Sequence, residues 1–199
     1  MQHLIRQLLA ELGEDPGREG LLHTPRRVEQ SLQFLTSGYQ ADVNAVLHGA
    51  VVPATDREIV IIKDVNFYSL CEHHLLPFFG RCHVAYIPTT TAIRPSAIAR
   101  VVDLFSRRLQ VQERLTSQIA DVIRDALTPI GVAVVMEATH LCMSMRGVEK
   151  QNSLAVTSAM LGAFREDARA RTHLLERLTL RADRSSVGAP GASNRTCPA

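Results

Sequence analysis

The sequence contains no tryptophan, few aromatic residues and almost no net charge. Aromatic residues are 5% of the 199 residues, and 22 basic against 20 acidic residues leave a formal charge of +2. Without a basic excess there is no overall field to hold nucleic acid, so an anionic ligand must be bound by local arginines. No apolar run approaches the length of a membrane span. We therefore expect neither a nucleic-acid-binding protein nor a membrane protein.

Cysteine is also scarce, and the N-terminus does not resemble a secretory leader. The four cysteines are Cys71, Cys82, Cys142 and Cys197. The first residues, MQHLIRQLLAELGEDPG, mix charges into their apolar positions, unlike the uninterrupted apolar segment of a leader. We therefore expect a cytoplasmic protein, in which cysteines serve metals or catalysis more often than disulfides.

What the chain does contain is an ordinary globular composition, with 46% hydrophobic and 21% charged residues.

Near the N-terminus, apolar residues recur at helical spacing from Leu4 to Leu12 and predict a first helix. In TPRRVEQSLQFL, Thr24 as N-cap and Pro25 as first helical residue predict a second helix that ends near Gly38. Both helices are amphipathic and need a partner surface.

The middle of the chain alternates between strand and helix patterns. Residues 58–69 and 81–88 are rich in β-branched residues and predict two strands. Residues 96–127 return to helical spacing and predict two helices separated near RRLQVQERL. Residues 131–142 and 154–164 predict two more strands. The order ββααββ indicates an α+β protein.

The motif CEHH joins the first two predicted strands and suggests a metal site. Cys71 and His74 are three residues apart, so one tight turn can direct both at the same ion. In THLC, His140 and Cys142 are two apart, which places them on one face of a strand. If the two stretches meet, Cys71, His74 and Cys142 form a Cys₂His set. Three protein ligands with an open fourth position are typical of catalytic zinc, and two thiolates favour zinc over magnesium or calcium.

Spacing alone leaves open whether these residues bind a metal, and whether that metal is catalytic. His73 and His140 would lie beside the ion without binding it, where they can move protons. The chain lacks the His-x-Glu and Pro-Cys-x-x-Cys motifs of zinc nucleobase deaminases. Cys82, on an alternating strand, is interpreted as a small buried apolar residue.

Taken together, five blocks resemble GTP cyclohydrolase I, the zinc enzyme of the T-fold group. The blocks are EDPGREGLLHTPRRV, CEHHLLPFFGRCHVAYIP, SRRLQVQERLT, EATHLCMSMRGVEK and TSAMLGAFRED, and they span Glu14 to Asp167. The resemblance implies N-terminal helices in residues 1–50, then a T-fold (ββααββ) in 51–183, with a four-stranded antiparallel sheet packed on two helices. Residues 184–199, rich in small residues, are predicted to form a disordered tail.

The resemblance also implies a reaction and its main residues. In this family GTP and water are converted to 7,8-dihydroneopterin triphosphate and formate, the first step of folate and pterin biosynthesis. Cys71, His74 and Cys142 match the zinc ligands. His73 and His140 match the histidines assigned to proton transfer at the purine and the ribose. Such transfers are needed because hydration of C8 requires a proton on N7.

Substrate contacts follow from the same resemblance. Gln112 and Glu113 match the family's guanine readers, and a carboxylate can accept together from guanine N1–H and the exocyclic amine. Without the resemblance, Glu113 would be interpreted as an ordinary solvated acid. Ser96, which opens a predicted helix, Arg100 and Arg146 match ligands of the triphosphate, as a helix N-terminus with arginines would suggest.

The sequence departs from the family at RPSA, residues 94–97. Relatives typically have Gly-Leu-Ser-Lys there, so the phosphate-binding lysine is replaced by Ala97. We expect Arg94 to supply the positive charge that the lysine provides in relatives. The alternative is a paralogue that acts on a related purine nucleotide or stops at a ring-opened intermediate. A second alternative is a non-enzymatic zinc or nucleotide-binding module with all zinc positions filled by protein, for which Glu72 is the one local candidate.

Assembly is expected as well. A four-stranded sheet with open edges is normally covered or paired with a neighbour. In relatives, pentamers close the sheets into a barrel and two pentamers stack into a decamer, with active sites built from more than one subunit. The resemblance therefore implies a homodecamer in which Ser96 and Arg100 serve a neighbour's zinc.

Overall fold

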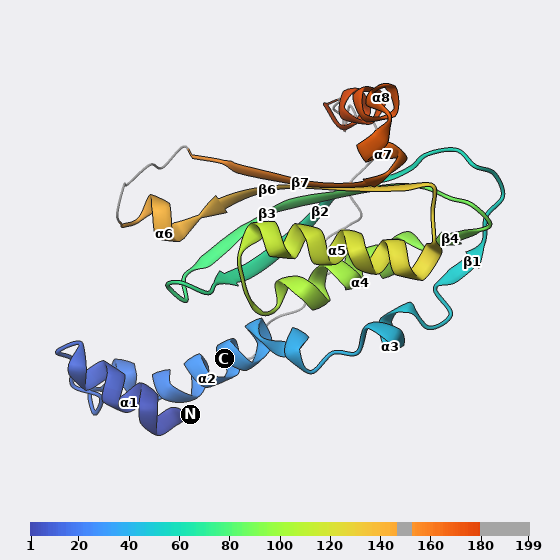
Figure 1. Cartoon of the computed structure of the whole chain (residues 1–199). Coiled ribbons are helices and arrows are strands. Elements are labelled where there is room, and N and C mark those ends of the chain that lie inside the picture. Colours follow the sequence, from blue (N-terminus) through green and yellow to red (C-terminus); the bar gives the residue numbers. More distant parts are fainter. Residues whose placement is uncertain (147–152, 180–199) are drawn as a thin grey trace, which may run out of the picture.

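A computed structural model describes residues 1–146 and 153–179, and Figure 1 shows a curved sheet with helices on both faces and a helical N-terminal arm. The helices are α1 Gln2–Glu11, α2 Thr24–Leu35, α3 Val43–Leu47, α4 Pro95–Ser106, α5 Gln112–Leu127, α6 Leu141–Ser144, α7 Ala163–Glu166 and α8 Ala168–Thr179, with 3₁₀ turns η1 Glu19–Leu21 and η2 Ser37–Tyr39. The strands are β1 Val51–Pro53, β2 Val60–Cys71, β3 Pro77–Ile87, β4 Thr91–Ile93, β5 Leu109–Gln110, β6 Gly131–His140 and β7 Ala155–Gly162. The predicted disordered tail, residues 184–199, lies outside the described residues. Within the described part, no helix has the length and apolar character needed to cross a bilayer.

The main sheet has the strand order β5-β2-β3-β6-β7. Its four long strands are antiparallel neighbours, because β2 pairs with β3, β3 with β6 and β6 with β7. The predicted ββααββ order and four-stranded antiparallel sheet are therefore confirmed. Two features were not predicted: β5 adds a short parallel pairing at the end of β2, and β1 pairs with β4 in a separate ribbon.

The helices α4 and α5 cover one face of the sheet, as Figure 1 shows. Their apolar residues at helical spacing, such as Ile98 and Val101 on α4 and Ile119 and Ile123 on α5, are fully buried. They pack against inward-facing sheet residues, including Val84, in one continuous core. This burial, which the helical periodicity predicts, supplies the main hydrophobic stabilisation of the domain.

The opposite face of the sheet carries α7 and α8, which the sequence patterns did not indicate. β7 ends at Gly162, whose φ of +57° lets the chain turn directly into α7. The predicted last strand, 154–164, is therefore too long at both ends. A smaller apolar cluster that includes Phe164 and Leu174 holds these helices on the sheet. Lys63 on β2 donates to the carbonyls of Arg177 and Leu178, near the C-terminus of α8.

The N-terminal arm consists of α1 packed on α2. The helix α2 begins at Thr24 with His23 as N-cap and ends at Leu35, so the predicted start is one residue late and the predicted end is too far along. A close contact ties the arm to the domain: Gly38 donates its N–H to the Arg107 carbonyl and accepts from the Arg108 guanidinium. A Cβ at Gly38 would lie 2.1 Å from the Leu104 carbonyl oxygen. Only glycine fits this approach.

A second glycine lies in the middle of the sheet, where β3 pairs with β2 on one side and with β6 on the other. Gly80 on β3 lies between Phe67 of β2 and Ala138 of β6. A Cβ there would lie 1.8 Å from the carbonyl oxygen of Glu137. The separation of β3 and β6 therefore depends on a residue without a side chain.

We predict that Gly80→Ala forces β3 and β6 apart and lowers the free energy of unfolding by about 2 kcal/mol or more, as expected for overpacking. Urea denaturation measures the change. The matched control is Gly20→Ala, where the added methyl meets only the flexible end of the Arg18 side chain, and we expect a shift of about 0.5 kcal/mol or less. Equal stability of the two variants would contradict the prediction.

Candidate metal centre and active site

The first half of the site is the turn that connects β2 to β3. The N–H groups of His74 and Leu75 both donate to the Cys71 carbonyl, at 3.3 and 2.8 Å, and Cys71 N–H donates to the Leu76 carbonyl. Leu75 adopts a positive φ of 56°, which closes the turn. The Cys71 Sγ and His74 Nδ1 atoms are 3.8 Å apart. The turn thus directs a thiol and an imidazole toward one point, as the three-residue spacing predicts.

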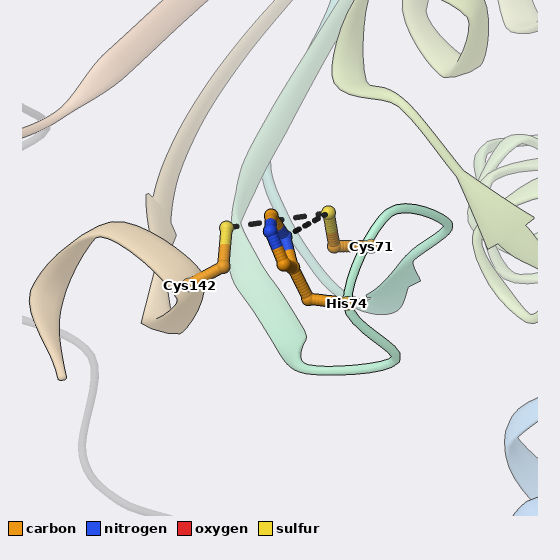
Figure 2. Close-up of side chains that lie close together, drawn as sticks. All are labelled: Cys71, His74 and Cys142. Carbon is orange, nitrogen blue, oxygen red and sulfur yellow. Dashed lines mark hydrogen bonds between the residues drawn. The ribbon is translucent and has the colours of Figure 1, made fainter. Parts of the chain in front are cut away.

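The second half comes from the end of β6. The strand ends at His140, and Cys142 lies on the short helix α6. The expectation that His140 and Cys142 share one face of a strand is therefore wrong, because the chain changes from strand to helix between them. The convergence itself is confirmed: the Cys142 and Cys71 sulfurs are 4.0 Å apart, and Figure 2 shows Cys142 facing Cys71 and His74.

Cys71, His74 and Cys142 form a group that could hold a metal ion. Their potential ligand atoms all lie within 4.8 Å of one another. Cys71 is buried and Cys142 half-buried. Burial, reinforced by the neighbouring Cys71 sulfur, raises the pKa of the Cys142 thiol. Two sulfurs and a nitrogen at this separation form a donor set for a soft or borderline divalent cation.

Glu72, the one local candidate for a further ligand, is engaged elsewhere. Its carboxylate forms a close ion pair with Arg114 on α5. The hydrogen bond from Arg114 lowers the pKa of the Glu72 carboxyl. Arg114 also donates from Nε to Gln110 Oε1 at 2.9 Å. This pair ties the turn to the start of α5, a contact that the sequence alone did not indicate.

The two histidines predicted to transfer protons lie beside the group of ligands. His73 Nδ1 is 3.7 Å from Cys71 Sγ, and its side chain is exposed. His140 lies directly opposite Phe78 in the β3–β6 pairing. The His140 ring stacks on Phe78 with centroids 4.6 Å apart and planes 4° from parallel. Burial lowers the pKa of His140, partly offset by the charge of Glu113.

The predicted guanine readers begin α5 and differ in exposure. Gln112 is 2% exposed, and its Oε1 atom lies 2.8 Å from His140 Nε2. Glu113 is exposed, and its negative charge partly offsets the lowering of the His140 pKa by burial. Arg146 follows Cys142 by four residues, and its positive charge lowers the pKa of the Cys142 thiol against the larger effect of burial. Gln112 therefore contacts His140 directly, while Glu113 follows it on α5 and Arg146 follows α6, which carries Cys142.

The remaining predicted phosphate ligands are not brought to this group within one chain. Arg94 is the N-cap of α4, and Ser96 and Arg100 lie in its first two turns, all exposed. The preceding Ile93 is hydrogen bonded to the hydroxyl of Tyr86. Tyr86 and Phe78 are eight residues apart on β3, which is about 26 Å along a strand. The α4 N-terminus therefore lies at the opposite end of the sheet from His140.

Several known proteins with similar sequences belong to one family. The family model described as GTP cyclohydrolase I matches residues 1–179. GTP cyclohydrolase 1 of Leptospira biflexa is 55% identical over 88% of this chain and 96% of its own. The Methylococcus capsulatus protein of the same name is 55% identical over 88% and 95%.

Among solved structures, the apo form of the archaeosine synthase QueF-Like is similar over 54% of this chain and 97% of its own, with TM-score 0.46 and 18% identity. That likeness is too distant to bear on function. The close relatives, by contrast, are aligned with this chain over almost their whole length. Together with the family match across the described domain, they show that this chain belongs to the GTP cyclohydrolase I family.

Proposed function

We propose that the protein is a zinc-dependent GTP cyclohydrolase I that converts GTP and water to 7,8-dihydroneopterin triphosphate and formate. The observation that carries the proposal is the convergence of Cys71, His74 and Cys142 beside two further histidines. The family membership assigns the reaction, and the donor set supplies the chemistry that the reaction requires. We further propose that the enzyme is cytoplasmic, with its catalytic domain beginning near residue 51.

Zinc fits the three ligands. Tetrahedral coordination with Zn–S and Zn–N bonds of ordinary length separates two sulfurs by about 3.8 Å, and a sulfur and a nitrogen by about 3.6 Å. The corresponding distances here are 4.0 Å between the sulfurs and 3.8 Å from Cys71 Sγ to His74 Nδ1. Metal binding would displace the thiol protons, since the thiolate is the ligand. When bound, zinc would activate water for attack at neutral pH.

The surrounding side chains support the roles predicted for them in proton transfer and substrate binding. His73 and His140 flank the ligands and are suited to move protons at the purine and the ribose. Glu113 is exposed and follows Gln112 at the start of α5, and we propose that its carboxylate accepts from guanine N1–H and the amine. The guanine contact of Gln112 stays a prediction. Arg146, four residues after Cys142, would hold one end of the triphosphate.

The position of α4 supports an oligomeric enzyme. Arg94, Ser96 and Arg100 surround a helix N-terminus, which favours anions. About 26 Å of strand separates them from His140, so they would serve the metal centre of another copy of the chain. Within the described residues, β7 pairs on one side only, with β6, which leaves an edge for a neighbouring sheet. We propose the family's homodecamer of two pentamers.

The replacement of the family lysine by Ala97 does not favour the alternative activity. Relatives that are 53–56% identical along most of this chain carry the name GTP cyclohydrolase 1. Ala97 is fully buried against the core in one chain, whereas Arg94 is exposed at the same helix terminus. The non-enzymatic alternative required a fourth protein ligand, and Glu72 is paired with Arg114 instead.

We predict that the purified, zinc-loaded protein releases formate from GTP and forms a pterin that fluoresces after oxidation. Formate assay and mass spectrometry of the product measure this. A product with the mass of a ring-opened purine would identify the paralogue activity instead. Absence of any GTP turnover in the zinc-loaded oligomer would contradict the proposed function.

We predict that Cys142→Ala removes the metal and the activity together, because two ligands bind zinc far more weakly than three. Elemental analysis should find about one zinc per chain in the wild type and almost none in the variant. Cys82→Ala is the matched control, since Cys82 is fully buried in the apolar core and its burial raises the thiol pKa to about 12. Retention of zinc by Cys142→Ala would refute the assignment of the ligands.

We predict that Arg94→Ala raises KM for GTP about tenfold, the loss expected for one charge-assisted contact to phosphate, with kcat changed little. Steady-state kinetics measures both constants. Arg6→Ala on the exposed surface of α1 serves as the control for loss of one positive charge. An unchanged KM in Arg94→Ala would show that the arginine does not replace the family lysine.

A further inference from the structure

The buried side chain of Gln112 has an unusual set of partners. Its Nε2 atom donates to the carbonyls of Met136 on β6, at 3.1 Å, and Ala155 on β7, at 3.0 Å. Its Oε1 atom lies 2.8 Å from His140 Nε2. The side chain therefore joins α5, two neighbouring strands and a candidate catalytic histidine.

These partners determine which way the amide points. Both carbonyl oxygens can only accept, so the NH₂ group must face them and the amide oxygen must face His140. A reversed amide would set its oxygen against two carbonyl oxygens, of Met136 and Ala155. The amide oxygen in turn can only accept, so His140 donates from Nε2–H and its Nδ1 atom carries the free lone pair in the neutral ring.

The ring plane of His140 is held independently. Phe78, fully buried, stacks on it nearly parallel at 4.6 Å. Phe78 is itself fixed by an edge-to-face contact with Phe67, at 5.9 Å. The stack restrains rotation of the imidazole plane, and the hydrogen bond from Nε2 selects one of the two tautomers.

We propose that Gln112 is a positioning residue: it holds His140 as the Nε2–H tautomer, with Nδ1 presented as the proton acceptor. This rests on the proposed function, in which His140 transfers protons. Both amide hydrogens of Gln112 are donated to backbone carbonyls, so its NH₂ group cannot also donate to a guanine base. Reading of the guanine then depends on Glu113, which is exposed in the same turn of α5.

Steady-state kinetics distinguishes a residue that orients His140 from one that binds the guanine base. We expect Gln112→Met, which keeps the length of the side chain and removes the amide, to lower kcat for formate release about tenfold or more and to leave KM for GTP within about twofold. Glu113→Gln should instead raise KM. If Gln112→Met raises KM as Glu113→Gln does and keeps kcat, Gln112 reads the base and the proposal is wrong.

The matched control for lost buried hydrogen bonds is Thr116→Val, one turn further along α5. Thr116 is 1% exposed, and its hydroxyl is bonded to Thr157 Oγ1 at 2.6 Å and to the Gln112 carbonyl, with no bond to His140. We expect kcat of Thr116→Val to match the wild type. An equal loss of kcat in both variants would mean general loosening of this region and would overturn the proposal.

Nitrogen-15 NMR of the histidine-labelled, zinc-loaded wild type tests the tautomer without any change at Gln112. His140→Gln identifies the signal. We expect hydrogen on Nε2 only, and loss of that preference in Gln112→Met. Hydrogen on Nδ1 in the wild type refutes the proposal even if Gln112→Met does not fold. If the wild type lacks GTP turnover but shows the Nε2–H tautomer, the proposed function fails and the coupling of Gln112 to His140 stands.

Discussion

The candidate active site depends on the pairing of β3 with β6. The turn that follows Cys71 leads into β3. The pairing brings this turn to the end of β6, just before Cys142. Ligand atoms must lie within a few ångströms of a common centre, so a register shift of even one residue would separate the sulfurs and turn His140 away from Phe78. Gly80 permits the close approach of the two strands, because a side chain there would meet the Glu137 carbonyl.

Around this frame, buried polar groups are paired rather than left to solvent. In the described residues, no buried side-chain nitrogen or oxygen lacks a hydrogen-bond partner. An unpaired buried polar group costs about 1–3 kcal/mol, so the partners of Gln112 are required for stability as well as useful for orienting His140. Glu72 and Arg114 act differently. Their ion pair is partly exposed and adds little to the free energy of unfolding, but it restrains the turn between β2 and β3.

The proposed substrate contacts are divided between the two ends of the sheet. The candidate metal ligands, both histidines and Glu113 are at one end, while Arg94, Ser96 and Arg100 are at the N-terminus of α4. Phe78 and Tyr86, which mark the two ends, are eight residues apart on β3, and no rotation of side chains can span that length. The proposed assembly, in which the α4 end of one chain approaches the metal end of another, would complete the site. Among the described residues the outer edge of β7 has no partner strand and is available to pair with a neighbouring sheet.

The sequence alone predicted the alternation of strands and helices and the burial of Ile98 and Ile119, because periodicity is a local property of the chain. Its motifs also indicated the family and, through that resemblance, the candidate ligands Cys71, His74 and Cys142. It did not reveal α8, the change from strand to helix between His140 and Cys142, or the ion pair of Glu72 with Arg114. Nor could it indicate that Gln112 bonds His140, since these residues are far apart in sequence and meet only through the register of β6 and the packing of α5. Those contacts were decided by the tertiary structure, in which long-range packing fixes the geometry that the local pattern leaves open.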